Sequence, residues 1–242
     1  MKSLLRRPPQ RIDITSAHHV LLRQHLFEQP VAQERTGRRV ADRSGLKLWP
    51  CALPLLRHLL AEVVPDLSAA LGRAPRVLEL GAGVGLLGIG LGVAGGCDVT
   101  LTDPALATRF AEHDADRATT LDWLAANVAL NGAAGGRCAA RRLVWGDAAD
   151  AAALAERGPF DLVVGADLLY ESAHYAALAA ALDAFAPADG AGPAAVLGYA
   201  HRVGGERRFF ADVAADRFAA TTAPLGGTKG GASVTALRRR KA

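Results

Sequence analysis

The chain has 242 residues, of which 50% are hydrophobic and 21% are charged, so it can bury a core and is not a globally disordered polypeptide. Its formal net charge of +4 comes from its two ends, because residues 1–47 hold ten Lys or Arg against four acids and residues 238–241 hold four more. The body between them, residues 48–237, carries 14 basic and 20 acidic side chains, a net charge of −6 that disfavours nucleic acid and favours cationic peptides as partners.

The three cysteines, Cys51, Cys97 and Cys138, form no C-x-x-C pair, so the sequence predicts neither a disulfide framework nor a zinc or other metal site. This pattern is typical of a reducing compartment, and we expect a cytoplasmic or nuclear protein. The first residues lack the apolar region of a secretion signal, although their Arg-rich composition leaves an organellar transit peptide as an alternative. The uncharged run 80–97 contains eight glycines, so we expect no membrane-spanning helix.

The first part of the chain shows no sustained hydrophobic period and is interrupted by prolines and a glycine. This predicts an irregular or partly disordered basic arm over residues 1–44, followed by one ordered domain over residues 45–242. The first helix of that domain is predicted over 53–64, where leucines and a valine recur at helical spacing ahead of Pro65.

From residue 76 onward, predicted strands and helices alternate. The expected elements are a strand at 76–80, a glycine turn with a helix to 93, a strand at 98–102, a helix at 121–128 ending at Asn131-Gly132, strands at 141–145 and 160–166, a helix at 175–185, a strand at 194–199, a helix at 206–213 and weak strands at 217–221 and 233–237. Such alternation predicts an α/β protein with a doubly wound parallel sheet, helices on both faces, and ligands at the carboxyl ends of the strands.

A glycine-rich turn joins the first of these strands to its helix, in the stretch Glu79-Leu80-Gly81-Ala82-Gly83-Val84-Gly85. Glycines let the backbone approach a ligand closely, and the start of the helix offers free N–H groups to an anion. The run Gly83-x-Gly85-x-x-Gly88, with Asp103 ending the next strand, also matches the dinucleotide fingerprint. The ligand is therefore a dinucleotide or S-adenosylmethionine, and a turn that serves only packing is the remaining alternative.

Two acids distinguish these ligands. Glu79 would repel a pyrophosphate at this strand end, whereas it suits the cationic ammonium of S-adenosylmethionine, in direct or water-mediated contact. Asp103 can accept hydrogen bonds from both ribose hydroxyls and would serve either cofactor. We therefore expect S-adenosylmethionine as the cofactor.

Several segments together resemble the seven-β-strand methyltransferases, and specifically the family-16 group of protein-lysine methyltransferases, of the methyltransferase-like 21 type. They are Gly45-Leu46-Lys47-Leu48-Trp49-Pro50, VLELGAGVGLLGI, VTLTDP, Asn127-x-x-x-Asn131, Trp145-Gly146 and Gly165-Ala166-Asp167-Leu168-Leu169-Tyr170-Glu171. The resemblance implies a Rossmann-like seven-stranded methyltransferase sheet and transfer of a methyl group to a lysine amine of a protein. The connection at residues 105–120 is longer than is usual in that group.

The resemblance also implies a set of cofactor contacts, to which Glu79 is added from its charge: Trp49, Gly81, Ala82, Gly83, Asp103, Trp145 and Ala166. The alternative for the two tryptophans is a packed position in the core. Asn127 and Asn131 are interpreted as helix-surface or C-cap residues outside the site.

The predicted catalytic residues are Asp167 and Tyr170, the first and last residues of the Asp-x-x-Tyr signature after the fourth strand. Asp167 would accept hydrogen bonds from the incoming lysine ammonium and aim it at the methyl donor. Tyr170 would line the lysine channel with its ring and hydroxyl. A helix N-cap is the alternative role for Asp167.

Three other functions stay open. One is a methyltransferase for nucleic acid or a small molecule, which is disfavoured because enzymes that methylate base amines usually show Asp/Asn-Pro-Pro-aromatic where this chain has Asp167-Leu168-Leu169-Tyr170. The others are a dinucleotide-dependent oxidoreductase and a non-catalytic binding protein with the same fold. By resemblance, the partner is a protein substrate such as a chaperone, a translation factor or an ATPase, and we expect a monomer.

Overall fold

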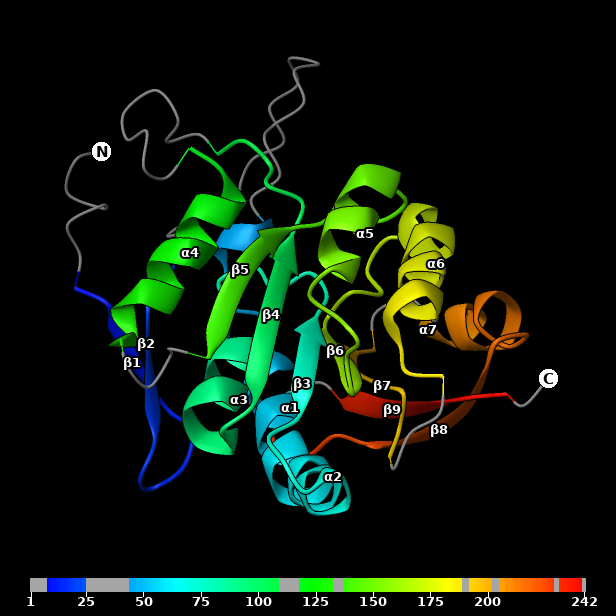
Figure 1. Cartoon of the computed structure of the whole chain (residues 1–242), viewed down its shortest axis with the longest axis horizontal. Helices are drawn as coiled ribbons and strands as arrows, with labels where there is room; N and C mark the ends of the chain where they lie inside the picture. The colour runs from blue at the N-terminus through cyan, green and yellow to red at the C-terminus, as the bar shows by residue number, and fades with distance from the viewer. Residues whose placement is uncertain are drawn as a thin grey trace.

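The computed structural model describes residues 8–24, 44–108, 118–132, 137–188, 192–201, 205–228 and 231–240. Its centre is a seven-stranded sheet in the order β5-β4-β3-β6-β7-β9-β8, shown in Figure 1. The strands are β3 Arg76–Glu79, β4 Asp98–Asp103, β5 Cys138–Arg142, β6 Leu162–Ala166, β7 Ala195–Ala200, β8 Phe218–Pro224 and β9 Ala232–Arg239. The first five are parallel to one another, and β9 runs antiparallel to both β7 and β8. The predicted α/β class and seven-stranded sheet are confirmed, whereas the prediction of a parallel sheet is wrong for β9, which makes the sheet mixed.

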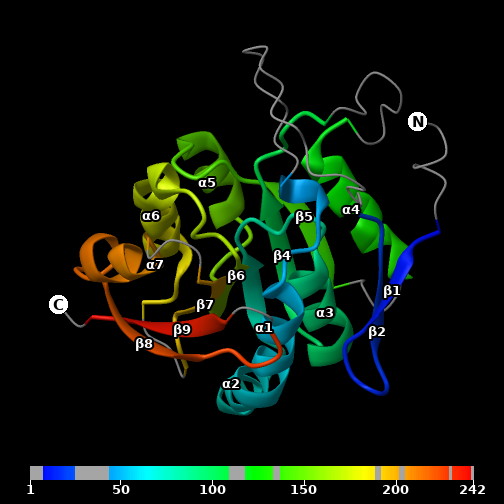
Figure 2. The same ribbon diagram turned by 180° about the vertical axis from the view of Figure 1, so that it is seen from behind.

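Helices cover both faces of the sheet, as predicted (Figures 1 and 2). They are α1 Ala52–His58, α2 Val64–Leu71, α3 Leu86–Gly95, α4 Thr120–Leu130, α5 Ala148–Ala155, α6 Tyr175–Phe185 and α7 Gly205–Arg208. Successive residues of a strand point to opposite faces, so Val77 packs with α1, α3 and α4 while Leu78 packs with α5 and α6. Two hydrophobic cores therefore enclose strands that are apolar on both sides.

The crossover connections reverse direction at β3. From β3 the chain crosses to β4 on one side, whereas β6, which comes later in the sequence, pairs with β3 on the other side. In doubly wound sheets, a ligand crevice opens at such a switch point, outside the carboxyl ends of the strands. The fold thus places the glycine turn after β3 beside the ends of β4 and β6.

The first helix continues past the proline that was expected to follow it. A π-helical turn, Leu59–Val63, joins α1 to α2, and Pro65 lies in the first turn of α2. A proline is tolerated there because the first N–H groups of a helix have no intrahelical acceptor. The helical segment ends instead at Gly72, whose φ of 65° gives a left-handed C-cap.

Two elements between β4 and β6 differ from the prediction. The third strand was expected at 141–145 but is β5 Cys138–Arg142, where Val99 pairs with Cys138 and Asp103 with Arg142. The apolar run that suggested a later strand follows β5 as a turn. Helix α5 was not predicted, although Asp147 caps it by accepting hydrogen bonds from the N–H groups of Ala149 and Asp150.

The prediction of an irregular arm over residues 1–44 is wrong for residues 10–22. These form an antiparallel hairpin of β1 Gln10–Asp13 and β2 His19–Leu22, in which Val20 and Leu22 are fully buried. The sequence signal was weak because such short strands depend on contacts with distant helices. Residues 1–7 and 25–43 lie outside the described residues, and the domain boundary at residue 44 stays a prediction.

The glycine-rich apolar run 80–97 forms the turn after β3 and the ten-residue helix α3, which packs against the sheet. Over the parts of the chain that the structure describes, no helix is both long enough and apolar enough to cross a membrane.

Candidate active site

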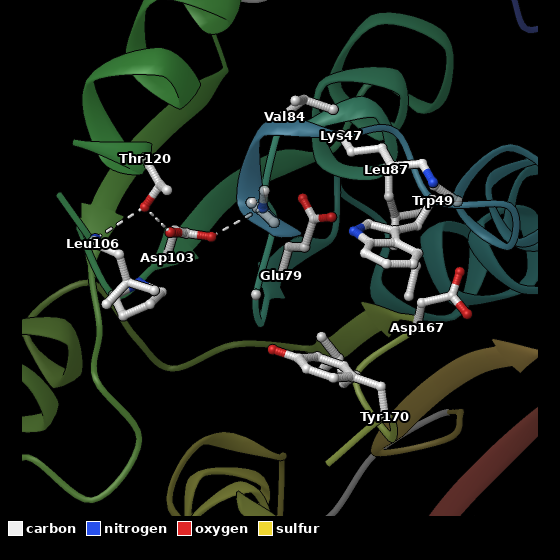
Figure 3. Close-up of a pocket in the computed structure, with 18 of the residues that line it drawn as sticks. Lys47, Trp49, Glu79, Val84, Leu87, Asp103, Leu106, Thr120, Asp167 and Tyr170 are labelled. Atoms are coloured by element: carbon white, nitrogen blue, oxygen red, sulfur yellow. Dashed lines mark hydrogen bonds between the residues drawn. The ribbon is translucent and has the colours of Figure 1, made fainter. Parts of the chain in front are cut away.

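A cavity of about 340 Å³ opens at the carboxyl ends of β3, β4 and β6. Its volume lies within the range of small-molecule sites, about 300–1,000 Å³. All ten residues predicted for the site line this cavity: Trp49, Glu79, Gly81, Ala82, Gly83, Asp103, Trp145, Ala166, Asp167 and Tyr170. Figure 3 shows Glu79 between Asp103 and Trp49, with Tyr170 on the other side of the cavity. Residues from five separate segments of the sequence thus meet at one place, while their individual roles stay predictions.

The turn after β3 requires glycine for two physical reasons. Gly81, Gly83 and Gly85 have φ values of 59°, 54° and 89°, which residues other than glycine rarely adopt. A Cβ atom at Gly81 would also lie 2.7 Å from Leu168 Cδ2, and one at Gly83 would lie 3.3 Å from the Gly45 carbonyl oxygen. The turn therefore brings bare backbone to the wall of the cavity.

Glu79 is buried at the end of β3, with 2% of its surface exposed. Its Oε2 accepts a hydrogen bond of 2.9 Å from the N–H of Gly88, in the first turn of α3. Burial raises the pKa of Glu79 to about 8, with a further rise from the negative charge of Asp103, and the bond from Gly88 opposes both. In the protein alone this acid is therefore mostly protonated at pH 7, and a cation beside it would restore its charge.

S-adenosylhomocysteine carries the same ammonium group as S-adenosylmethionine. We expect the affinity of the protein for S-adenosylhomocysteine to rise by up to about tenfold per pH unit between pH 6 and 8. A cation that binds next to Glu79 favours the ionised form of this acid. Below pH 8, binding of the ligand therefore releases a proton from Glu79, and well above pH 8 it releases none. Calorimetry in two buffers of different ionisation enthalpy measures that proton directly. The variant Glu79→Gln keeps an acceptor for the N–H of Gly88 and should abolish the pH dependence of the affinity. If the variant had the same pH profile as the wild type, Glu79 would not contact the ammonium group of the ligand.

Asp103, at the end of β4, is also buried, and its hydrogen-bond partners include two donors. Its Oδ2 accepts a hydrogen bond of 3.1 Å from Gly83 N–H, and its Oδ1 accepts one from the Thr120 hydroxyl (Figure 3). A carboxylate can accept about four hydrogen bonds, so these two do not preclude a diol ligand. The donors fix the carboxylate between the glycine turn and the start of α4.

Asp167 follows β6 in a left-handed backbone conformation, with φ of 56°. Its Oδ2 accepts a hydrogen bond of 3.0 Å from Cys51 N–H, and its Oδ1 accepts one of 3.2 Å from Ala200 N–H. The side chain thus ties the start of α1 and the end of β7 to the end of β6. It does not cap the helical turn that follows it, Ser172–His174, whose N-cap residue is Glu171, so the alternative role as a helix N-cap is wrong.

The aromatic residues form the sides of the cavity. Tyr170 is 46% exposed and lies at the rim. Trp49 and Trp145 are only partly buried, and the ammonium of Lys47 lies 5.0 Å from the centre of the Trp49 ring. Trp145 packs beside the glycine turn, because a Cβ at Gly81 would be 3.5 Å from its Cζ2 atom. The tryptophans are therefore cavity walls and are not fully buried in the core.

The sequence analysis missed several residues that line the same cavity. Thr120 is the most informative, since its hydroxyl donates to Asp103 and accepts a hydrogen bond of 3.1 Å from Leu106 N–H. The capping box of α4, in which Thr119 and Asp122 bind each other's backbone N–H groups, was the signal that could have located this helix start. Other missed residues are Gly45, Lys47, Leu48, Pro104, Leu106, Leu143, Val144 and His174.

Asn127 and Asn131 depart partly from their interpretation. Asn131 is the C-cap of α4, as one of the alternatives proposed. Asn127 is not on the surface but fully buried, and it binds both the Val84 carbonyl in the glycine turn and the backbone of Arg23. Neither lines the cavity.

The chain matches a protein-family model described as "Lysine methyltransferase" over residues 33–216. It is 34% identical over 119 residues to Protein N-lysine methyltransferase METTL21A of Danio rerio, an alignment that covers 48% of this chain and 47% of that protein. It is also 34% identical over 124 residues to EEF1A lysine methyltransferase 3 of Mus musculus, covering 51% of this chain and 43% of that protein. The chain therefore spans about half the length of these curated relatives.

Two solved structures that are named as methyltransferases have a similar fold. A methyltransferase from Pyrococcus furiosus superposes with a TM-score of 0.50 at 14% identity, covering 78% of this chain and 84% of that one. The glycopeptide N-methyltransferase MtfA, solved with S-adenosylmethionine, gives the same TM-score and identity and covers 74% of this chain and 87% of that one. At such low identity these similarities establish the fold.

Proposed function

Because this chain belongs to the lysine methyltransferase family, we propose that it transfers a methyl group from S-adenosylmethionine to the side-chain amine of a lysine in a protein substrate. The observation that carries the proposal is one cavity at which three buried acids, Glu79, Asp103 and Asp167, meet a glycine turn. Two of the acids suit the two ends of an adenosyl amino acid, and the third suits an incoming amine.

The cavity fits S-adenosylmethionine in its chemistry. Glu79 offers a carboxyl group whose ionised form is costly without a cation, which matches the ammonium end of the cofactor. Asp103 offers acceptors for the ribose hydroxyls, and Trp49, Trp145 and Leu106 offer apolar surface for the adenine. Gly81, Ala82, Gly83 and Ala166 let the backbone approach the ligand closely. When bound, S-adenosylmethionine supplies an electrophilic methyl group for the acceptor amine.

The protein's work is to position the acceptor amine and control its protonation. A lysine side chain normally titrates near pH 10.4, so it must lose a proton before its lone pair can react. Partial burial in the apolar mouth of the cavity lowers the pKa of the amine, and Asp167 can accept a hydrogen bond from it and direct it. The bonds from Cys51 and Ala200 hold the Asp167 carboxylate in a fixed orientation for this task.

Removing the ring of Tyr170 should weaken use of the protein substrate far more than binding of the cofactor. The ring lies at the rim, where it can contact an incoming cationic side chain, an interaction of about 0.5–2 kcal/mol. We expect Tyr170→Ala to lower kcat/KM for the protein substrate by roughly tenfold and Tyr170→Phe by less, while the Kd for S-adenosylhomocysteine stays within a few-fold of wild type. Steady-state kinetics with calorimetry tests this, and an equal loss in both would place Tyr170 in the cofactor site.

The rival functions are disfavoured by the same residues. The segment after β6 has leucines where enzymes that methylate base amines usually have prolines, and the body of the chain is acidic. Glu79, buried beside the glycine turn, gains an ion-pair partner from an ammonium group and none from a pyrophosphate, which favours S-adenosylmethionine over a dinucleotide. Asp167 and Tyr170 both line the cavity, which argues against a binding protein without catalysis.

We also propose a class of protein substrate, a location and an oligomeric state. The relatives are named for lysine methylation, one of them on EEF1A, so a cytoplasmic or nuclear protein such as a translation factor is the class of substrate that we propose. The cysteines Cys51, Cys97 and Cys138 are free thiols, which fits a reducing compartment. We propose that the enzyme acts as a monomer.

Incubation of the purified protein with a cell lysate and isotopically labelled S-adenosylmethionine tests the proposed function. Mass spectrometry of labelled proteins should locate the new methyl groups on lysine side chains of one or a few substrates. Label found only in RNA or in small metabolites would overturn the choice of acceptor.

A further inference from the structure

The N-terminal hairpin is docked firmly on the helices that flank the cavity. In Figure 2 it lies beside α3 and α4, and β2 contacts both helices. Val20 and Leu22 are fully buried, and the guanidinium of Arg57 on α1 donates hydrogen bonds of 3.1 Å to the carbonyls of Asp13 and Ile14. The hairpin therefore packs directly against the helices beside the cavity.

Two asparagines of α4 bind this hairpin as a neighbouring strand would. Asn131 accepts from Leu21 N–H at 2.9 Å and donates to Leu21 O at 3.0 Å, and Asn127 does the same with Arg23 at 2.8 and 3.0 Å. Residues four apart on a helix are about 6 Å apart along its axis, which matches the spacing of about 6.6 Å between alternate residues of a strand. The two amides thus satisfy successive outward-facing backbone groups of the hairpin.

Asn127 makes a third hydrogen bond, and this one reaches the cavity. Its Nδ2 donates to the Val84 carbonyl at 2.9 Å, and Val84 belongs to the glycine turn and lines the cavity. Backbone N–H groups can only donate and carbonyls can only accept, so the partners fix which way the amide points. Asn131 differs here, because its third bond, at 2.7 Å, goes to the Asn127 carbonyl within α4.

A second side chain joins the end of the hairpin segment to the opposite wall. Gln24 accepts a hydrogen bond of 2.9 Å from Leu48 N–H, and Leu48 lines the cavity next to Trp49. Gln24 is itself held by Gln10 at the start of the hairpin, through a bond of 2.7 Å between their side chains. Residues 10–24 therefore hold two separate segments of the cavity wall.

We propose that the β1–β2 hairpin is a positioning element of the cofactor site, which acts through Asn127 on the glycine turn and through Gln24 on the segment that carries Trp49. This inference rests on the proposed function, because it takes the cavity to be the S-adenosylmethionine site. Asn127 does not line the cavity, so it is a positioning residue and not a catalytic one. The hairpin sets the affinity for the cofactor by holding Val84 and Leu48 in the arrangement that the ligand requires.

The paired asparagines provide a matched test. Each amide makes three hydrogen bonds, two of them to the hairpin, but only Asn127 also binds the glycine turn. We expect Asn127→Ala to raise the Kd for S-adenosylhomocysteine by about tenfold and Asn131→Ala by less than about threefold, although both lower Tm. Asn127→Ala should also raise KM for S-adenosylmethionine more than it lowers kcat. Equal changes in Kd for the two variants would overturn the proposal.

A second pair covers the case in which Asn127→Ala does not fold. Gln24→Ala removes the bond to Leu48 and should raise the same Kd by several-fold, whereas Gln10→Ala, which only loses its bond to Gln24, should change it less. Identical values for Gln24→Ala and wild type would contradict the second arm of the proposal. A wild-type protein that fails to bind S-adenosylhomocysteine would overturn the proposed function, while wild-type binding with equal variants would overturn only the role of the hairpin.

Discussion

Asp167→Ala should lower kcat for lysine methylation by at least about 100-fold while leaving the Kd for S-adenosylhomocysteine within about threefold of wild type. The carboxylate lies at the end of a central strand and lines the cavity, where it can accept a hydrogen bond from the acceptor amine. Without this carboxylate, the amine is no longer oriented toward the methyl group, and its ammonium form has lost a hydrogen-bond acceptor. Single-turnover kinetics with a substrate protein measures the effect, and calorimetry measures the Kd.

The structure adds a stability cost to this prediction. Asp167 accepts hydrogen bonds from Cys51 and Ala200 N–H, and each buried N–H left without an acceptor costs about 1–3 kcal/mol. Asp167→Asn is the matched control, because its carbonyl oxygen keeps one of these bonds while the negative charge is lost. It should be more stable than Asp167→Ala and nearly as inactive. Substantial activity in Asp167→Asn would leave Asp167 with a purely structural role.

Asp103→Ala should raise the Kd for S-adenosylhomocysteine by about 100-fold, the largest effect on cofactor binding that we expect. Two hydrogen bonds between a carboxylate and ribose hydroxyls are lost, and bonds to a charged group are worth about 1.5–3 kcal/mol each, part of which water recovers. Gly83 N–H also loses its acceptor, so the glycine turn is loosened. Isothermal titration at constant pH measures the change.

Thr120→Val is the control for Asp103. It removes the hydroxyl that donates to Asp103 Oδ1 but keeps the carboxylate and the shape of the side chain. We expect a change of only a few-fold, because the bond from Gly83 still orients the acid. If Asp103→Ala bound the ligand as well as wild type does, the cofactor site would lie elsewhere.

The position of the candidate site could be predicted from the sequence because its residues lie where strands end. In a parallel sheet the carboxyl ends of neighbouring strands meet at one edge, so Glu79, Asp103 and Ala166 had to come together once their strands were located. Trp49 and Trp145 were predicted as cofactor contacts from the resemblance to a family, because a tryptophan by itself does not indicate a ligand contact. All of them line the same cavity in the structure.

The rest depended on contacts between distant parts of the chain. The bonds from Cys51 to Asp167 and from Arg23 to Asn127 span more than a hundred residues, and no local pattern encodes them. The hairpin was missed for the same reason. Helix α5 was missed because its alanines give hardly any hydrophobic period. The strand β5 was predicted too late in the sequence because the apolar residues that follow it line a turn at the cavity.

The central claim is that the glycine turn and its two acids hold a sulfonium cofactor. Isothermal titration of the wild-type protein with S-adenosylhomocysteine and, separately, with NAD tests it most directly. We predict binding of one S-adenosylhomocysteine per chain and no heat of binding with NAD. Saturable binding of NAD together with none of S-adenosylhomocysteine would contradict the account.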